Sequence, residues 1–234
     1  MTADDATAET SAATGTRRDL AVARGIDSAR SRAEHRVELF LDAARELMQA
    51  NSGEFTVQEV VERSGQSLRT FYQYFAGKHE LLLALFEESI RTTAEHLREV
   101  VATEDDPLER LHRFSVEYYR VCQPSPPRGS GKSQPTMAMA MAEFAQQLLT
   151  GHPKEASHAF VPLVSLAEEI LDEAAAAGRI RSNLNHGRIA GIVLQAIMFN
   201  AFAATISASS VRPESDTGEE LWDLLVQGIG AASS

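Results

Sequence analysis

Two side chains that can recognise bases in DNA lie four residues apart, at Arg69 and Gln73. Arginine can donate two hydrogen bonds to guanine, and glutamine can form two with adenine. Hydroxyl and ammonium groups suit phosphate oxygens, and Thr70, Tyr72 and Lys78 supply such groups nearby. Any one of these residues is equally typical of an ordinary solvated helix face. Together they indicate a surface for double-stranded DNA, provided that the chain places them on one exposed helix.

The residues just upstream carry the signals of a helix start. The Thr56 hydroxyl can cap a helix, and Glu59 can reach back to the Thr56 backbone N–H, which makes a capping box. Phe55 and Val60 are spaced to pack together as a hydrophobic staple around that cap. These signals predict a helix over residues 57–64.

A second short helix is predicted after a tight turn. Gly65 suits the positive φ that ends a helix, and Ser67 can cap the next one, over residues 68–74. Two short helices joined in this way form a helix-turn-helix. Its apolar inner face is predicted to comprise Val57, Val60, Val61, Leu68 and Phe71. The candidate DNA-contacting residues are Thr56, Val57, Gln66, Ser67, Leu68, Arg69, Thr70, Tyr72, Gln73, Tyr74 and Lys78.

This stretch resembles the TetR family of transcriptional regulators, of the TetR/AcrR type. Residues 64–78 read SGQSLRTFYQYFAGK, which is similar to the family pattern A-G-V-S-x-G-T-L-Y-x-Y-F-x-x-K. The preceding FLDAARELMQANSGEFT resembles the family's first helix and its approach to the second. The likeness covers roughly residues 35–88, under half of the chain. Arg69 stands where the family often has glycine, so the DNA sequence that relatives read is not carried over to this chain.

The resemblance implies an all-α protein in two parts. A three-helix head over residues 34–80 would bind DNA, and a larger helical body over residues 81–230 would bind an effector and form a dimer. In the family the last two helices form a four-helix dimer interface, and residues 186–229 occupy that place. A twofold dimer matches a roughly palindromic operator. The implied activity is that of a repressor which a small molecule releases from DNA, and activation is left open as the alternative.

The net charge of −11 does not by itself favour a nucleic-acid partner, but the charge is unevenly distributed. Residues 81–234 contain 12 basic and 20 acidic side chains, whereas residues 17–80 contain 10 of each. A neutral head can still present a few cations to phosphates. We therefore expect DNA affinity to rest on a modest number of contacts, repeated by a second subunit.

The composition indicates a soluble globular protein of the cytoplasm. A hydrophobic content of 44% is ordinary for such a protein. The single cysteine, Cys122, excludes an internal disulfide and provides no framework for a metal. No run of about 18 apolar residues predicts a membrane span, and the N-terminus lacks the apolar core of a secretion signal.

A polar composition predicts that residues 1–33 form a disordered arm. A solubilising tail is the simpler interpretation of its arginines, and an arm that enters the minor groove is the alternative. A loop is predicted over residues 123–135, where four prolines stand. Helical periodicity predicts further helices over residues 34–50, 79–102, 107–121, 154–177, 186–207 and 215–229, while residues 136–150 are apolar and flexible.

Methionine and aromatic side chains in the body can line a cavity, since thioethers adapt to irregular shapes. Ordinary core packing produces the same pattern, so the two interpretations stay open. The candidate effector-binding residues are Phe114, Tyr118, Met141, Phe144, Leu166, Ile170, Met198 and Phe202. Their apolar character predicts a small, largely apolar effector.

No catalytic framework is apparent in the sequence. Adjacent acidic pairs such as Glu168 and Glu169 point about 100° apart on a helix, as on a solvated face. His152 and His158 lack further ligands at metal spacing, and no phosphate loop or nucleophile elbow is present. We therefore expect no enzyme activity, no metal site and no cofactor. Two alternatives to an effector-released repressor remain: a DNA-binding regulator that needs no effector, and a helical binding module that no longer meets DNA.

Overall fold

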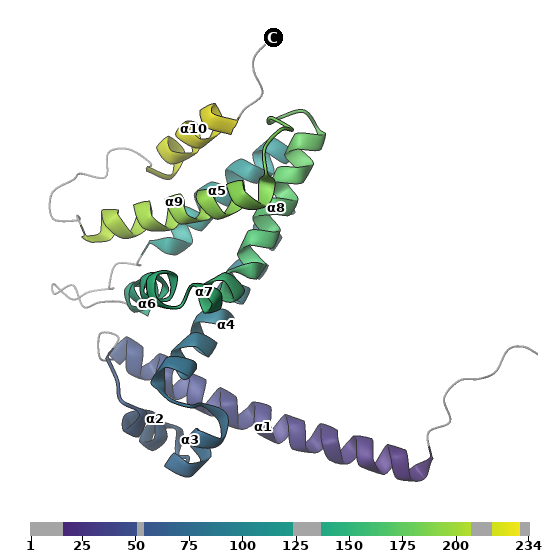
Figure 1. Cartoon of the computed structure of the whole chain (residues 1–234), viewed down its shortest axis with the longest axis vertical. Helices are drawn as coiled ribbons and strands as arrows, with labels where there is room; N and C mark the ends of the chain where they lie inside the picture. Colours follow the sequence, from purple (N-terminus) through teal and green to yellow (C-terminus); the bar gives the residue numbers. More distant parts are fainter. Residues whose placement is uncertain (1–15, 51–53, 124–136, 207–216, 230–234) are drawn as a thin grey trace, which may run out of the picture. The chain divides into compact units, whose positions relative to one another are not determined.

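The structure is a computed structural model that describes residues 16–50, 54–123, 137–206 and 217–229, the side chains of residues 137–139, 202 and 204–206 excepted. The described residues form an all-α chain without a β-strand. None of the described helices combines the length and the apolar character that a membrane crossing needs. The helices are α1 (Arg17–Ala50), α2 (Val57–Ser64), α3 (Leu68–Tyr74), α4 (Lys78–Val101), α5 (Pro107–Cys122), α6 (Met137–Gly151), α7 (Pro153–Ala159), α8 (Val161–Ala176), α9 (His186–Ile206) and α10 (Thr217–Ile229) (Figure 1).

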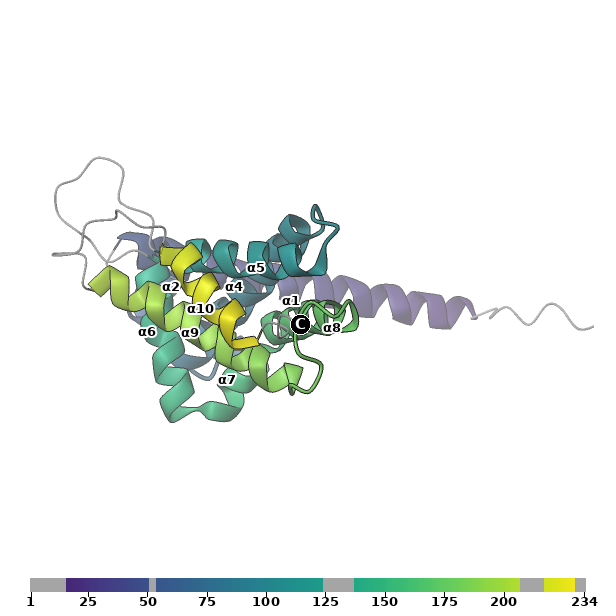
Figure 2. The same cartoon turned by 90° about the horizontal axis from the view of Figure 1, so that it is seen from above.

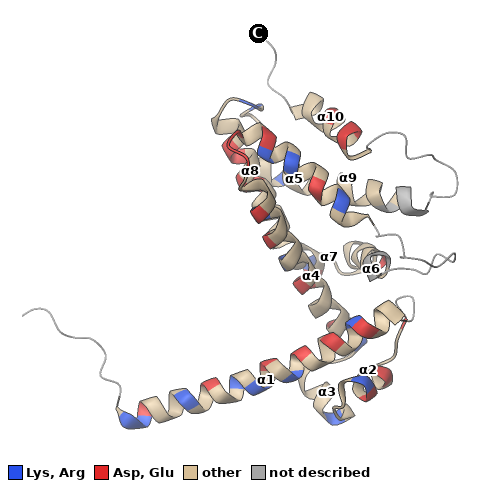
Figure 3. Cartoon of the chain, turned by 180° about the vertical axis from the view of Figure 1, so that it is seen from behind, with Lys and Arg blue, Asp and Glu red and all other residues tan. Residues whose placement is uncertain are grey.

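The first helix begins at Arg17, so the prediction of disorder is wrong for residues 17–33. The Thr16 hydroxyl accepts a hydrogen bond from the Asp19 N–H at 3.3 Å, which caps the helix start. Basic and acidic residues alternate along α1 (Figure 3), and Arg30 pairs with Glu34 one turn later at 2.7 Å. Alanine and arginine are strong helix formers, so a segment that is too polar to form a core can still be helical. Residues 1–15 of the predicted arm lie outside the described residues.

The chain divides into two compact units, residues 1–39 and residues 40–234. The predicted helix over residues 154–177 is two helices in the second unit, α7 and α8, which meet at Phe160. Pro162 lies in the first turn of α8, where its missing N–H costs no helical hydrogen bond. Proline within a continuous helix would break the bonding pattern, which explains why the helix is interrupted there.

The core of the second unit lies where α4, α5, α8 and α9 pack against one another (Figures 1 and 2). Each helix contributes large side chains that are almost completely buried: Leu97, Phe114, Leu163, Leu171 and Ile197. The last helix, α10, packs on α5, where the rings of His112 and Trp222 lie 5.0 Å apart. Burying a side chain of this size stabilises the fold by about 1.5–3 kcal/mol, so this cluster dominates the stability of the body.

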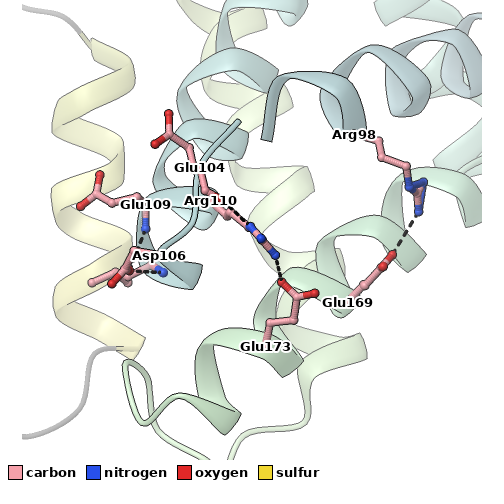
Figure 4. Close-up of polar contacts among 8 residues, drawn as sticks. Arg98, Glu104, Asp106, Glu109, Arg110, Glu169 and Glu173 are labelled. Atoms are coloured by element: carbon pink, nitrogen blue, oxygen red, sulfur yellow. Dashed lines mark hydrogen bonds and ion pairs between the residues drawn. The ribbon is translucent and has the colours of Figure 1, made fainter. Parts of the chain in front are cut away.

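Polar contacts order the corner between α4 and α5 (Figure 4). The Asp106 carboxylate caps α5 by accepting from the Leu108 N–H at 2.8 Å. Arg110 donates to the Glu104 carbonyl at 2.7 Å and to the Glu173 carboxylate at 2.6 Å, which connects the corner to α8. Half-exposed ion pairs of this kind contribute less than about 1 kcal/mol each. They therefore help to set how α5 and α8 are aligned, while the apolar core holds them together.

Candidate nucleic-acid interface

The start of α2 has the predicted capping box. The Thr56 hydroxyl accepts from the Glu59 N–H at 3.2 Å, and a Glu59 carboxylate oxygen accepts from the Thr56 N–H at 2.7 Å. The hydrogen bond from the Thr56 N–H, and next the one that the Thr56 hydroxyl donates to the same carboxylate at 2.8 Å, lower the pKa of Glu59 below its ordinary value. The cap satisfies backbone N–H groups that a helix start otherwise leaves to water. The entry into the helix-turn-helix is thus determined by local chemistry.

The turn between α2 and α3 depends on one glycine. Gly65 has φ of 65°, the left-handed conformation that side chains other than glycine rarely adopt. Its N–H donates to the Glu62 carbonyl and the Gln66 N–H to the Val61 carbonyl, both at 3.3 Å, as in a Schellman motif. Ser67 then caps α3 by accepting from the Thr70 N–H at 3.0 Å. The chain therefore reverses within a few residues and starts a new helix.

An aromatic cluster of Phe40, Phe71 and Phe75 holds the inner side of α3. Phe71 is fully buried, and its ring lies 5.4 Å from that of Phe40 and 5.5 Å from that of Phe75. Edge-to-face pairs such as Phe40 with Phe71 add to the stabilisation that burial provides. Because Phe71 is fixed on the inside of a helix of under two turns, the side chains on its opposite side must face solvent.

The outer side of α3 presents the residues that were predicted to recognise bases. Arg69 and Gln73 are exposed, and among the described residues neither is engaged in a hydrogen bond or an ion pair. Tyr72 is 57% exposed and its ring packs edge-on against Phe71 at 5.4 Å. Leu68 is 42% exposed, so its placement on the apolar inner face was wrong. As the first residue of α3, it presents an apolar side chain to solvent.

Several of the predicted phosphate-contacting groups already have partners within the protein. The hydroxyls of Ser67 and Thr70 are hydrogen-bonded to each other at 2.8 Å, while that of Thr56 is part of the α2 cap. Lys78 donates to the Phe55 carbonyl at 2.6 Å, and its ammonium lies 4.4 Å from the centre of the Phe55 ring. Lys78 therefore fastens the start of α4 to the segment ahead of α2, a role that the sequence pattern did not indicate.

The remaining predicted DNA contacts are less exposed. Val57, Gln66 and Tyr74 are half-buried. They lie at the edges of the helix-turn-helix, near the start of α2, in the turn and at the end of α3. The structure thus brings the eleven predicted residues into one region, with Leu68, Arg69, Tyr72 and Gln73 as its exposed centre.

A cavity of about 310 Å³ lies between α4, α5, α6 and α9. Three of the predicted effector-binding residues line it, namely Tyr118, Met141 and Met198. Phe86, Ile90 and Cys122 also line it, and the sequence pattern did not single them out for this role. The wall is mainly apolar, with the hydroxyls of Ser89, Thr93 and Tyr118 as polar groups. Burial raises the pKa of the Tyr118 hydroxyl well above its ordinary value, which keeps it neutral.

The other predicted effector-binding residues do not line this cavity. Phe114 and Phe144 are buried in the packing of the body. Leu166 and Ile170 line a different hollow, whose other walls include Arg98, Arg110, Glu169 and Glu173, four of the charged residues in Figure 4. The side chain of Phe202 lies outside the described residues. Helical periodicity identifies the buried side of each helix but does not distinguish a tightly packed position from a cavity wall.

Comparison with known proteins agrees with this arrangement. Residues 40–85 match the sequence profile described as bacterial regulatory proteins, tetR family. Among solved structures, the transcriptional regulator FadR from Bacillus subtilis in complex with stearoyl-CoA is 18% identical, with a TM-score of 0.59 over 82% of this chain and 98% of that one. RolR in complex with the ligand resorcinol is 16% identical, with a TM-score of 0.64 over 86% of this chain and 91% of that one.

A further structure of the same fold is a TetR family transcription regulator from Marinobacter aquaeolei VT8. It is 16% identical, with a TM-score of 0.59 over 86% of this chain and 99% of that one. No curated protein matches the chain. The helix-turn-helix lies within the residues that match the tetR family profile, and the chain as a whole shares the all-α fold of these transcriptional regulators.

Proposed function

We propose that the protein is a cytoplasmic transcriptional regulator, without enzyme activity, that inserts α3 into the major groove of DNA. The observation that carries this proposal is the division of α3 into two sides. Phe71 is fully buried, while Arg69, Tyr72 and Gln73 on the other side are exposed. Arg69 would pair with guanine and Gln73 with adenine, while the Tyr72 hydroxyl would reach a phosphate. Residues 34–80 would act as the reading head and residues 81–230 as the body, with α4 continuing from one into the other.

The regulator would act as a dimer through residues 186–229. Exposed apolar side chains on α9 and α10 support this part of the proposal, since Ile192 is 53%, Phe199 42% and Leu224 69% exposed. Ile192 and Phe199 are seven residues apart and so lie on the same side of α9. Exposed large apolar groups that share a surface are typical of an interface. A twofold dimer would place two copies of α3 in successive major grooves and would therefore read a roughly palindromic operator.

The body would hold a small, largely apolar effector that releases the protein from its operator. The cavity beside Tyr118, Met141 and Met198 supports this, as does the occurrence of stearoyl-CoA and resorcinol in two proteins of the same fold. A ligand that prefers the conformation unable to bind DNA would weaken operator binding by its differential affinity. The cavity reaches Phe86, Ile90 and Thr93 of α4, the helix that follows α3, so a ligand would contact the connection to the head.

The test is selection of a binding sequence from random DNA, followed by gel shifts with wild-type protein and two variants. We expect Arg69→Ala to weaken binding to the selected site by about 1–3 kcal/mol, roughly tenfold to a hundredfold, and to relax the preference for one base pair. We expect Tyr72→Phe to weaken binding to all sequences to a similar extent, because it removes a phosphate contact.

Arg91→Ala is the matched control, since Arg91 is an exposed arginine on α4 that pairs with Glu95 at 2.8 Å outside the reading surface. It should bind like the wild type. Equal binding by Arg69→Ala, Tyr72→Phe and the wild type would show that the assigned reading surface is wrong. Failure to enrich any sequence would favour a helical module that does not meet DNA.

A further inference from the structure

Three potential metal ligands meet where the start of α4 lies beside the junction of α6 and α7. They are His79, His152 and Glu155, and their ligating atoms all lie within 4.8 Å of one another. The Nε2 atom of His79 is 2.7 Å from a Glu155 carboxylate oxygen, and the Nδ1 atom of His152 is 3.6 Å from the other. Among the residues that the structure describes, this is the one group of three such side chains.

Local structure brings two of the ligands together and packing supplies the third. His152 immediately precedes α7 and Glu155 lies in its first turn, so a three-residue spacing puts both on the same side. His79 is the second residue of α4 and comes from far away in the sequence. Its ring lies 4.5 Å from that of His152 and 5.7 Å from that of Phe144 on α6, between centroids. The three side chains are 39–51% exposed, so an ion can reach them from solvent without unfolding.

The donor set has a definite preference among metal ions. Imidazole nitrogen suits zinc and neighbouring transition metals, whereas magnesium and calcium prefer an all-oxygen environment. Zinc bonds of about 2.0–2.1 Å in tetrahedral geometry place neighbouring ligand atoms roughly 3.3 Å apart. The His79 Nε2 atom lies 2.7 Å from one Glu155 oxygen and the His152 Nδ1 atom 3.6 Å from the other, on either side of this value. Side-chain rotation would have to bring the three ligating atoms, now within 4.8 Å of one another, to the tetrahedral spacing. Three protein ligands would leave the fourth position to water.

We propose that His79, His152 and Glu155 form a binding site for one divalent transition-metal ion of the zinc type. Two histidine–glutamate pairs elsewhere in the described residues serve for comparison. His96 on α4 lies 3.1 Å from Glu117 on α5, and His158 on α7 lies 3.8 Å from Glu87 on α4. What distinguishes the proposed site is that one ligating atom from each of three residues, which come from two segments of the chain, lies within 4.8 Å of the others.

Because of its position, metal binding at this site would also alter DNA binding, an inference that rests on the proposed function. His79 lies five residues after Tyr74, the last residue of α3, and the buried Phe75 and the half-buried Gly77 connect the two. An ion bound to His79 and to the α6–α7 junction would fix the first turn of α4 relative to the body. It would thereby restrict the orientations that α3 can adopt and alter the affinity for the operator.

Metal binding is tested by titrating chelator-treated, untagged full-length protein with Zn²⁺, and with Co²⁺ to record the visible spectrum of a tetrahedral site. We expect one ion per chain, with excess Mg²⁺ unable to compete. His79→Gln, His152→Gln and Glu155→Gln should each weaken binding at least about tenfold. Thermal melts in the presence of chelator establish that each variant is folded. His96→Gln is the control and should bind like the wild type.

Binding that is equal in the wild type and the three variants would overturn the proposal, as would no binding at micromolar Zn²⁺. The cluster would then be an ordinary set of polar contacts. The regulatory consequence is tested separately, by measuring operator affinity with and without Zn²⁺. We expect a change of at least about fivefold, and the operator must change the Zn²⁺ affinity by the same factor.

No change in operator affinity, despite Zn²⁺ binding, would refute the regulatory coupling and leave the metal site established. Failure to find any operator would refute the proposed function instead, and the Zn²⁺ titration alone would then decide the metal site.

Discussion

Cys122 is the single cysteine of the chain. It lines the cavity, and its thiol is a weak acid. Burial raises the pKa of its thiol to about 11, and a hydrogen bond with Tyr118 partly opposes the rise. The reactive form of cysteine is the thiolate, which is scarce near neutral pH when the pKa is this high. The residue is therefore suited to report on the cavity rather than to react with oxidants.

We predict that alkylation of Cys122 by a small reagent such as iodoacetamide is slow at pH 8. At this pH the fraction of Cys122 present as thiolate is about a hundredfold below that of a thiol of pKa 9. A thiolate of higher pKa is the stronger nucleophile, which raises its rate about tenfold. The net rate of alkylation is therefore about tenfold lower than that of the ordinary thiol. The rate should keep rising as the pH increases towards 11, because deprotonation is not complete below that value. Mass spectrometry of timed samples gives the rates.

The unfolded protein in urea provides the control, since its cysteine should titrate near the ordinary value. A rate in the folded protein that levels off near pH 9 would contradict the raised pKa. A compound that fills the cavity should slow alkylation further, which makes the same assay a test for the effector proposed above.

At the scale of elements, the helix-turn-helix depends on a backbone conformation rather than on packing at Gly65. A methyl group added at this position would meet no atom within 4 Å. Any cost of substitution therefore comes from the positive φ of 65° and not from a clash. The turn is thus sensitive to the addition of a single methyl group at Gly65, even though this group would make no contact.

We predict that Gly65→Ala lowers the free energy of unfolding by about 1 kcal/mol, since alanine is strained in the left-handed region. Gly65→Asn should cost less, because asparagine tolerates this conformation better than other residues with a side chain. Urea denaturation followed by circular dichroism measures both. If alanine and asparagine are equally destabilising, the backbone conformation is not the cause.

At the scale of the whole molecule, the proposed dimer can be tested by comparing an exposed residue inside the proposed interface with one outside it. Ile192 on α9 and Val22 on α1 are each 53% exposed, yet only Ile192 lies in the proposed interface. The two residues are therefore a matched pair with equal exposure and similar chemistry. A charge at a buried interface position costs several times more than one on a solvated surface, because it loses its hydration.

We predict that Ile192→Glu weakens the dimer, whereas Val22→Glu leaves it unchanged. Sedimentation equilibrium across a range of protein concentrations measures the dissociation constant, and we expect an increase of at least about tenfold for Ile192→Glu, corresponding to about 1.4 kcal/mol. Operator affinity should fall with it, since one head makes half of the contacts. An unchanged dimer in Ile192→Glu would place the interface elsewhere.

The sequence by itself was sufficient for the helix-turn-helix. The Thr56 cap, the Gly65 turn and the Ser67 cap are confirmed because each acts through neighbours within a few residues. The same signals place Arg69 and Gln73 outside, since Phe71 must be inside. The extent of α1 was not predicted, because polar composition is shared by disordered segments and by solvated helices.

The tertiary structure alone decided which distant residues meet. It joins Tyr118 of α5 to Met141 of α6 and Met198 of α9 around the cavity, and it moves Leu166 and Ile170 to another hollow. It brings His79 to Glu155, which lies 76 residues further along the chain. The physical reason is range: caps and turns are stabilised by adjacent residues, whereas a cavity or a ligand set depends on how whole helices pack.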